Sequence, residues 1–298
     1  MKKFISILLT VIMCISLFAC TKTSTPEPKG DENITASETQ KDEAVKEEKK
    51  DTASDTKADE KETAEPAIQP AAIQKTLNIE ADVKDGYTFD NGIYTFTKGG
   101  IYKIFGDFEE GQLYVNAPDE EVELQLAGVS LTSKINSVIF IEKAEEVKIK
   151  ALDGTVNYLY DLREKKVSED DAAGSACIFS KDDLKIQGKG ALYVEAHYNN
   201  GIHSKNDIKI KNLTLEVTAP NNAIKGNDSI TIESGTINIT STEGDGLKTK
   251  DTDISSKGKQ RGIIDIQGGT VTITAASKCI KAAFDVQISE EAKVFTNK

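Results

Sequence analysis

The sequence contains no Trp, only two His and four Cys, and its aromatic residues make up 6% of the chain. So few His and Cys form no cluster with the spacing of a zinc site, and no candidate nucleophile stands beside a plausible base. The chain carries 37 Lys and Arg against 49 Asp and Glu, a formal net charge of −12. A chain this acidic lacks the basic surface that holds phosphate backbones, so we exclude DNA and RNA as partners.

The first twenty residues have the order of an export signal. Two lysines precede an apolar run, residues 4–18, and polar sequence follows at once. The run is shorter than the about 20 apolar residues that span a membrane. Its end, Leu-Phe-Ala-Cys at 17–20, resembles the lipobox of bacterial lipoproteins. This implies that residues 1–19 are removed and that Cys20 is lipidated, which anchors the protein to the outer face of the cytoplasmic membrane. A secreted protein cut by an ordinary signal peptidase is the alternative.

Residues 21–72 lack the composition of a folded segment. They contain 14 acidic and 8 basic side chains, no aromatic residue and no Leu. Such a segment buries too little apolar surface to offset its conformational entropy. We therefore expect residues 20–72 to form a disordered tether that carries a folded domain, residues 73–298.

Internal repeats determine the expected architecture of that domain. Aliphatic residues with similar flanking sequence recur at spacings of 24, 22, 23 and 33, at Ile178, Ile202, Ile224, Leu247 and Ile280. A second row has spacings of 23, 22 and 34, at Val194, Val217, Ile239 and Ile273. Two rows with one period indicate a repeat of about 22 residues with one insertion of about ten.

Each repeat offers three short alternations of Ile, Val and Thr with polar residues, separated by Asn, Asp and Gly, and no 3.6-residue stripe appears. These patterns predict an all-β fold, a right-handed parallel β-helix with three strands per coil, begun by a cap at residues 87–98. Coils of such a solenoid stack about 4.8 Å apart. Cys177 and Cys279 share a row but lie four coils apart, about 19 Å, so we expect two buried, unpaired thiols.

A cationic column is predicted on one outer face of the coils. If Ile202 points into the core, the next residue points out, and the same holds in every coil. The exposed column then contains Phe179, His203, Lys225, Lys248 and Lys281, with Lys181, Lys205 and Lys250 two residues further on. Charges that recur with every coil suit a linear polyanion such as an acidic polysaccharide. The alternative is that the lysines merely keep an exposed sheet soluble.

Carboxylates gather around the insertion at residues 251–261. Asp228 and Asp251 belong to a column at a turn, and Asp245, Asp251 and Asp253 flank the insertion. Several hard oxygen ligands at a loop suit Ca²⁺, so we predict a Ca²⁺ ion held by these four residues; a role in turns is the alternative. A second insertion is expected at 153–174. Sugar-stacking residues would be sought among Tyr158, Tyr160, Tyr193 and Tyr198.

With its repeats aligned, the domain resembles a family of bacterial, often clostridial, β-helical lipoproteins that are classed as carbohydrate-binding and related in fold to polysaccharide lyases. The likeness covers about residue 87 to the end, and the matching motifs stand at 99–102, 179–184, 200–207, 244–248 and 268–273. The resemblance implies binding of plant polysaccharides, including acidic ones, with Ca²⁺ held by the β-helix. This chain differs by having Asn200, Asn222 and Lys278 where such proteins commonly have Asp. Its repeats run to Lys298 without a polar cap, which indicates an unusual end or a longer parent chain.

Three functions are compatible with these features. The first is a cell-surface lipoprotein, monomeric, that binds acidic, pectin-like polysaccharide with help from Ca²⁺ through His203, Tyr198 and the lysines of the column. The second is a Ca²⁺-dependent polysaccharide lyase, for which nothing in the sequence singles out a base. The third is a structural or adhesive surface protein without catalysis.

Overall fold

The structure is a computed structural model that describes residues 76–164 and 174–298. Cys20, the signal and the predicted tether lie outside these residues, so what was predicted for them stays a prediction. The described part of the chain consists of strands joined by turns and contains no helix of the length and apolarity that crossing a bilayer requires.

A small antiparallel cap begins the fold. β1 (Asn78–Ala81) pairs antiparallel with β4 (Gly100–Phe108), and β2 (Tyr87–Asp90) forms a hairpin with β3 (Ile93–Phe96). The hairpin turn is Asn91-Gly92, with φ of 48° and 82°, the residue pair that such a left-handed turn favours. The cap expected at the start of the stack is therefore present.

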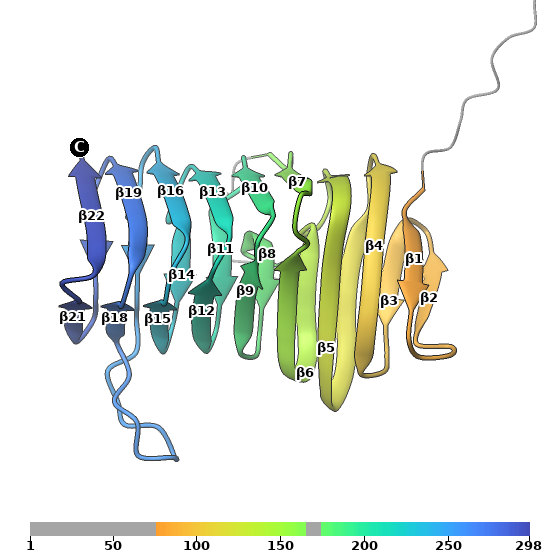
Figure 1. Ribbon diagram of the computed structural model, residues 1–298, viewed down its shortest axis with the longest axis horizontal. Coiled ribbons are helices and arrows are strands. Elements are labelled where there is room, and N and C mark those ends of the chain that lie inside the picture. The colour runs from red at the N-terminus through yellow and green to blue at the C-terminus, as the bar shows by residue number, and fades with distance from the viewer. Residues whose placement is uncertain (1–75, 165–173) are drawn as a thin grey trace, which may run out of the picture. The chain divides into compact units, whose positions relative to one another are not determined.

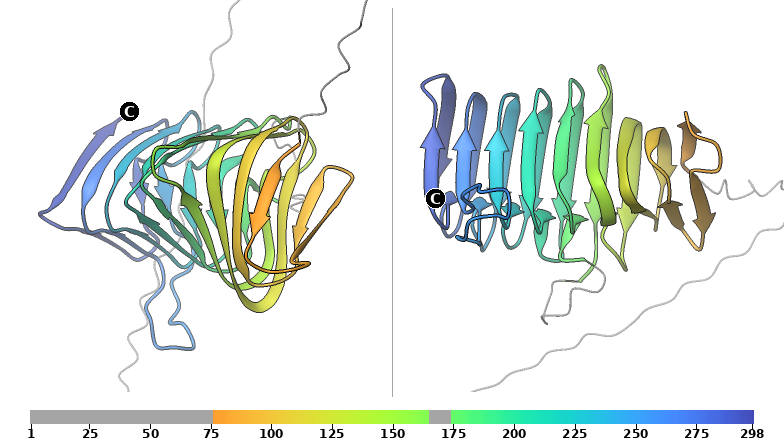
Figure 2. Two further views of the ribbon diagram at one scale, coloured as in Figure 1. Left: turned by 45° about the vertical axis from the view of Figure 1, so that its right-hand side comes forward. Right: turned by 90° about the horizontal axis from the view of Figure 1, so that it is seen from below.

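After the cap, strands pair in parallel with the strand one coil later, and three faces of strands surround one core (Figures 1 and 2). The first face contains β3, the first part of β5 (Gln112–Ser133), the first part of β6 (Ile139–Ala151), β8 (Ala176–Ser180), β11 (Asn200–Ser204), β14 (Ile224–Gly226), β17 (Leu247–Lys248) and β20 (Ile280–Lys281). The second face contains β4, the later parts of β5 and β6, β9 (Leu184–Gly188), β12 (Asp207–Lys211), β15 (Ser229–Ile232), β18 (Ile263–Ile266) and β21 (Asp285–Ile288). The third face contains the end of β5, β7 (Val156–Asp161), β10 (Ala191–Ala196), β13 (Thr214–Ala219), β16 (Thr236–Ser241), β19 (Gly269–Ala275) and β22 (Ala292–Asn297).

For the described residues this pairing confirms an all-β fold built on a long parallel sheet and agrees with a parallel β-helix of three strands per coil; the right-handed winding stays a prediction. Both predicted aliphatic rows are in register, on the first and third faces. Apart from the half-buried Ile280 in the last coil, their members are buried. Alternate residues point inward, and the repeat period is nearly constant. An inward-pointing Ile, Leu or Val of each coil therefore lies directly above the equivalent aliphatic side chain of the neighbouring coil. Each such side chain contributes about 1.5–3 kcal/mol on burial.

Asn side chains link the coils at the turn before the first face. The amide nitrogen of Asn222 donates to Oδ1 of Asn200 at 2.8 Å, and both side chains are buried. Asn200 in turn donates to the carbonyl oxygen of Ser175 at 2.8 Å. A buried amide that satisfies its neighbour in this way avoids the cost of an unpaired polar group. These Asn residues therefore stabilise the stack.

Both thiols in the described part of the chain are free, as predicted. Cys177 is fully buried, whereas Cys279 is half-buried because it lies in the last coil. Residues 251–262 project from the stack ahead of β18 (Figure 1) and confirm the first insertion. The second insertion is shorter than predicted, since β7 is a regular strand of the third face.

Candidate functional site

The predicted lysines follow the outer surface of the first face. Lys225, Lys248 and Lys281 lie in register on β14, β17 and β20. Neighbouring strands are about 4.8 Å apart, so these side chains begin at that interval along the stack. Lys205 and Lys250 stand two residues beyond their rows, at the turn. We call these five residues the lysine column.

Asp245 lies beneath the lysine column and holds two of its members. Its side chain is 4% exposed, and its Oδ2 is 3.3 Å from Nζ of Lys248 and 3.3 Å from Nζ of Lys281. Burial opposes the ionisation of Asp245. Hydrogen bonds from Ser277 and from the Lys278 N–H, together with Lys248, outweigh burial and hold the pKa of this carboxyl below its usual range. Asp245 is therefore an anion at neutral pH that orients two ammonium groups.

The other end of the predicted column is buried, which corrects our expectation of an exposed strip. His203 is 4% exposed and Phe179 1%, although both occupy the predicted row. The Nδ1 of His203 lies 2.6 Å from Oγ of Ser175, its Nε2 lies 3.2 Å from Oδ1 of Asn227, and its ring packs edge-on against Phe179. Phe179 also packs against Phe140 in a small apolar cluster outside the main core. His203 thus lies below the surface that a glycan would touch.

Tyr198 is half-buried, and one face of its ring is already in use. The guanidinium of Arg163 lies over it, with Cζ 4.0 Å from the ring centroid. Arg163 is itself buried and bound by the buried Asp161 at 2.6 Å. The structure therefore uses Tyr198 in internal packing and leaves at most its other face for a sugar.

The four carboxylates predicted to hold Ca²⁺ are divided between two places. Asp245 belongs to the lysine column, whereas Asp228 and Asp253 bind Arg261 of the projecting loop, at 2.7 Å through Nε and 2.8 Å through Nη1. Burial raises the pKa of Asp228 even though Arg261 opposes this. Asp251 is half-buried nearby. Among the described residues no three His, Cys, Asp or Glu are grouped as a metal would require. The four residues thus do not fit one shared ion as they stand, and calcium stays a prediction.

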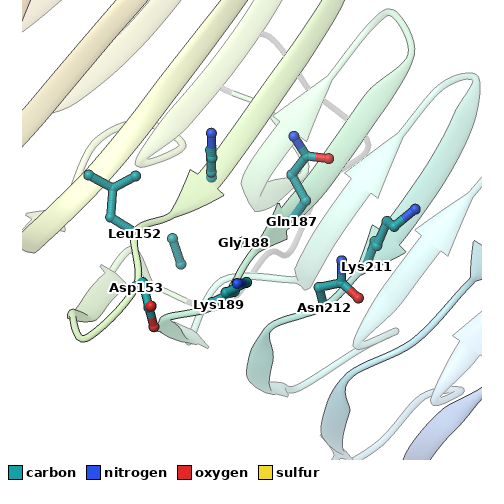
Figure 3. A pocket seen from close by; sticks show the side chains of 9 residues that line it. Leu152, Asp153, Gln187, Gly188, Lys189, Lys211 and Asn212 are labelled. Atoms are coloured by element: carbon teal, nitrogen blue, oxygen red, sulfur yellow. The ribbon is translucent and has the colours of Figure 1, made fainter.

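A pocket that the sequence analysis missed lies at the corner between the second and third faces (Figure 3). It has a volume of about 440 Å³ and is built from three successive coils, at the ends of β6, β9 and β12. We call it the corner pocket; its polar lining consists of Lys150, Asp153, Gln187, Lys189, Lys211 and Asn212. Leu152 lines it as well, so the pocket combines apolar surface with groups that donate hydrogen bonds.

The corner pocket depends on a turn that only glycine can form. Gly188 has a φ of 131°, and a Cβ at this position would clash with the Ala151 carbonyl oxygen. Lys150 is paired with Glu123 at 3.2 Å, whereas Lys189 makes no ion pair with any described residue. One sequence signal could have located this row: the motif Lys-Ile-Lys stands at 148–150 and again at 209–211, with Lys-Ile-Gln at 185–187 between them.

Three comparisons bear on these surfaces. A family model described as carbohydrate-binding domain-containing protein matches residues 90–296. A carbohydrate-binding domain-containing protein of Acetivibrio thermocellus is 39% identical over 143 residues, which is 47% of this chain and 50% of that protein, so the chain spans about half the length of this curated relative. The solved structure of a gadolinium derivative of the polysaccharide lyase-like protein from C. thermocellum superposes with a TM-score of 0.64 at 34% identity, covering 72% of this chain and 95% of that one.

Proposed function

Because the chain belongs to the family of carbohydrate-binding domain-containing proteins, we propose that it binds an acidic polysaccharide along the lysine column. One observation carries the proposal: Lys225, Lys248 and Lys281 project from consecutive strands in register, and Asp245 orients two of them. A row of ammonium groups that repeats with the strand spacing suits a linear polymer whose negative charge also repeats. The bound chain would lie parallel to the axis of the stack.

Binding without cleavage is the simpler function for this surface. A lyase must place a base beside the proton that it removes from a uronate and must stabilise the charge that develops. His203 is buried, and Lys248 and Lys281 are already engaged by Asp245. Polysaccharide lysis remains the alternative, because the superposed solved structure is lyase-like. If the protein steadily formed an unsaturated, ultraviolet-absorbing product from polygalacturonate, its function would be that of a polysaccharide lyase and not of a binding protein.

The test uses column lysines that do not hold the buried carboxylate. Replacing Lys205, Lys225 and Lys250 by Gln removes three positive charges and leaves the Asp245 pairs intact. If each contact is worth about 0.5 kcal/mol, affinity for polygalacturonate should fall about tenfold. The salt dependence of binding should also become weaker, because fewer charge contacts remain to be screened. Titration calorimetry at two salt concentrations measures both.

The matched control makes the same charge change elsewhere, in Lys84→Gln with Lys134→Gln and Lys293→Gln, three residues outside the lysine column. The control should bind polygalacturonate like the unmodified protein. A neutral β-glucan should bind equally to all three proteins. If the control and column variants lost equal affinity, or if the column variant lost equal affinity for the neutral and the acidic glycan, the lysine column would not bind glycans through their negative charges.

We also propose that the mature chain acts as a monomer at the cell surface, held by a lipid on Cys20. The lipobox-like sequence supports this proposal. In the native host the protein should fractionate with membranes and incorporate labelled fatty acid, and Cys20→Ala should abolish both. Light scattering should give the mass of one chain. Release of the unmodified protein into the medium would favour secretion instead.

A further inference from the structure

Three tyrosines form an aromatic surface on the third face, in which Tyr158 is exposed and Tyr160 and Tyr193 are half-buried. Tyr158 and Tyr160 point outward from β7, and Tyr193 lies beside Tyr158 on β10, in register. The rings of Tyr158 and Tyr160 are 6.0 Å apart and inclined by 4°, and those of Tyr158 and Tyr193 are 5.1 Å apart and inclined by 21°. Tyr158 is 37% exposed. We call these three residues the tyrosine platform.

The tyrosine platform adjoins the corner pocket on the same coils. Lys189 and Asp153 line the pocket, and the chain runs from them into β10 and β7, which carry the platform. A strand advances about 3.3 Å per residue, so Lys189 and Tyr193 start within about 13 Å of each other. Val156, which is 46% exposed, and its register partner Ala191 lie between the pocket and the platform and supply apolar surface there. A polar pocket, a short apolar step and parallel aromatic rings thus follow one another around the corner of the stack.

This sequence of surfaces matches the two sides of a sugar. A pyranose ring presents an apolar C–H face that packs on an aromatic ring, and a rim of hydroxyl or carboxylate groups that accepts hydrogen bonds. Gln187, Lys189 and Asn212 offer amide and ammonium donors in the pocket. An exposed apolar patch rimmed by polar groups commonly marks an interaction site.

The charged residues around the platform favour a glycan over a protein partner. Glu195 lies in register with Tyr160, and the corner pocket is lined by lysines. Lys and Glu are depleted at the centres of protein–protein interfaces, which are built mainly on apolar contacts. Charged and amide groups next to aromatic rings are instead suited to hydroxyl-rich ligands.

We propose that the tyrosine platform and the corner pocket form a second glycan-binding site, separate from the lysine column. A sugar ring packs on the outward surface of the stacked Tyr158 and Tyr193 rings, and the next units of the same chain enter the pocket, where they bind Lys189. The ligand runs around the coil, across the direction of a ligand on the lysine column. This proposal rests on the proposed function, since it takes polysaccharide binding as its premise.

Tyrosine fluorescence provides a direct test, because the chain has no Trp and eight Tyr. The full protein is titrated with β-1,4-linked glucose oligomers of two to six units and with a galacturonate hexamer. We expect a fluorescence change that saturates and an affinity that rises with chain length. Tyr158→Ala with Tyr193→Ala should weaken glucose-hexamer binding at least tenfold, whereas Tyr158→Phe with Tyr193→Phe keeps the rings and most of the affinity. Lys189→Gln should weaken binding of the galacturonate hexamer more than that of the glucose hexamer.

The outcomes separate this site from the lysine column. Retained glucose-hexamer binding in the Ala variant, with an unchanged melting temperature, would overturn the platform even if the column variant loses polygalacturonate. If the melting temperature of the Ala variant is lowered, the single variant Tyr158→Gln is tested instead. Unchanged affinity of Tyr158→Gln for the glucose hexamer would also overturn the proposal. A change of oligomeric state without a change in glycan affinity would identify the platform as a contact between copies and overturn it as well. Failure of the unmodified protein to bind any glycan would refute both sites.

Discussion

Replacing Lys248 and Lys281 by Met removes the two ammonium groups that stand 3.3 Å from the buried carboxylate of Asp245. Breaking a fully buried ion pair on one side costs about 3–5 kcal/mol. Here the lysine side chains are 28% and 45% exposed, so solvent screens part of the attraction, and hydrogen bonds from Ser277 and Lys278 remain. We expect a loss of about 2 kcal/mol in the free energy of unfolding, a fall of about 4–8 °C in melting temperature.

A third substitution, Asp245→Asn, should recover most of this loss in the double Met variant. The neutral amide no longer needs a cation, and it can continue the hydrogen-bonded row of Asn200 and Asn222, since the Asp245 N–H already lies 3.4 Å from Oδ1 of Asn222. In the unmodified background the same substitution should cost less than about 1 kcal/mol, because it removes both the ion pairs and the penalty of burying a charge. Urea unfolding followed by far-ultraviolet circular dichroism at pH 7 measures all four proteins.

The pH dependence checks the same assignment. A carboxyl whose pKa is lowered on folding stabilises the protein above its unfolded pKa of about 3.9, and this contribution is lost as the pH falls through the lower folded value. The difference in the free energy of unfolding between the unmodified protein and Asp245→Asn should therefore be constant near neutral pH. It should shrink below about pH 4, where the Asp245 carboxyl becomes protonated. If Asp245→Asn fails to rescue the double Met variant, Asp245 is not the anion that these lysines balance.

Two further predictions concern the projecting loop and the thiols. Because Arg261 occupies the carboxylates of Asp228 and Asp253, we expect millimolar Ca²⁺ to raise the melting temperature more in Arg261→Gln than in the unmodified protein; equal shifts would show that Arg261 does not compete with the ion. Native protein should react with maleimide at Cys279 far faster than at Cys177, because Cys177 is fully buried and burial raises the pKa of its thiol. Peptide mass spectrometry locates the label, and rapid labelling of Cys177 before unfolding would contradict its burial.

Much of the fold follows from the repeat alone. In a stack where each coil contacts its neighbours, one period determines which residues lie above one another, and a slip by one residue would turn the aliphatic row outward. For this reason the row of Ile202, the row of Val194 and the alignment of Lys225 with Lys248 were all predictable. The comparisons then placed the chain in a family of carbohydrate-binding domain-containing proteins, which agrees with the resemblance in the sequence.

What covers each side chain was decided by the tertiary structure. His203 points away from the core as the alternation requires, yet Ser175 and Phe179 pack around it and bury it. Strand alternation sets the direction of a side chain, whereas its exposure depends on neighbours from other coils and turns. The corner pocket likewise depends on Gly188 and Asn212, whose φ values of 131° and 64° turn the chain sharply between two faces. The repeat period determines which residues of successive coils lie above one another along the axis. The burial of His203 and the corner pocket depend instead on how the backbone turns from one face to the next within each coil.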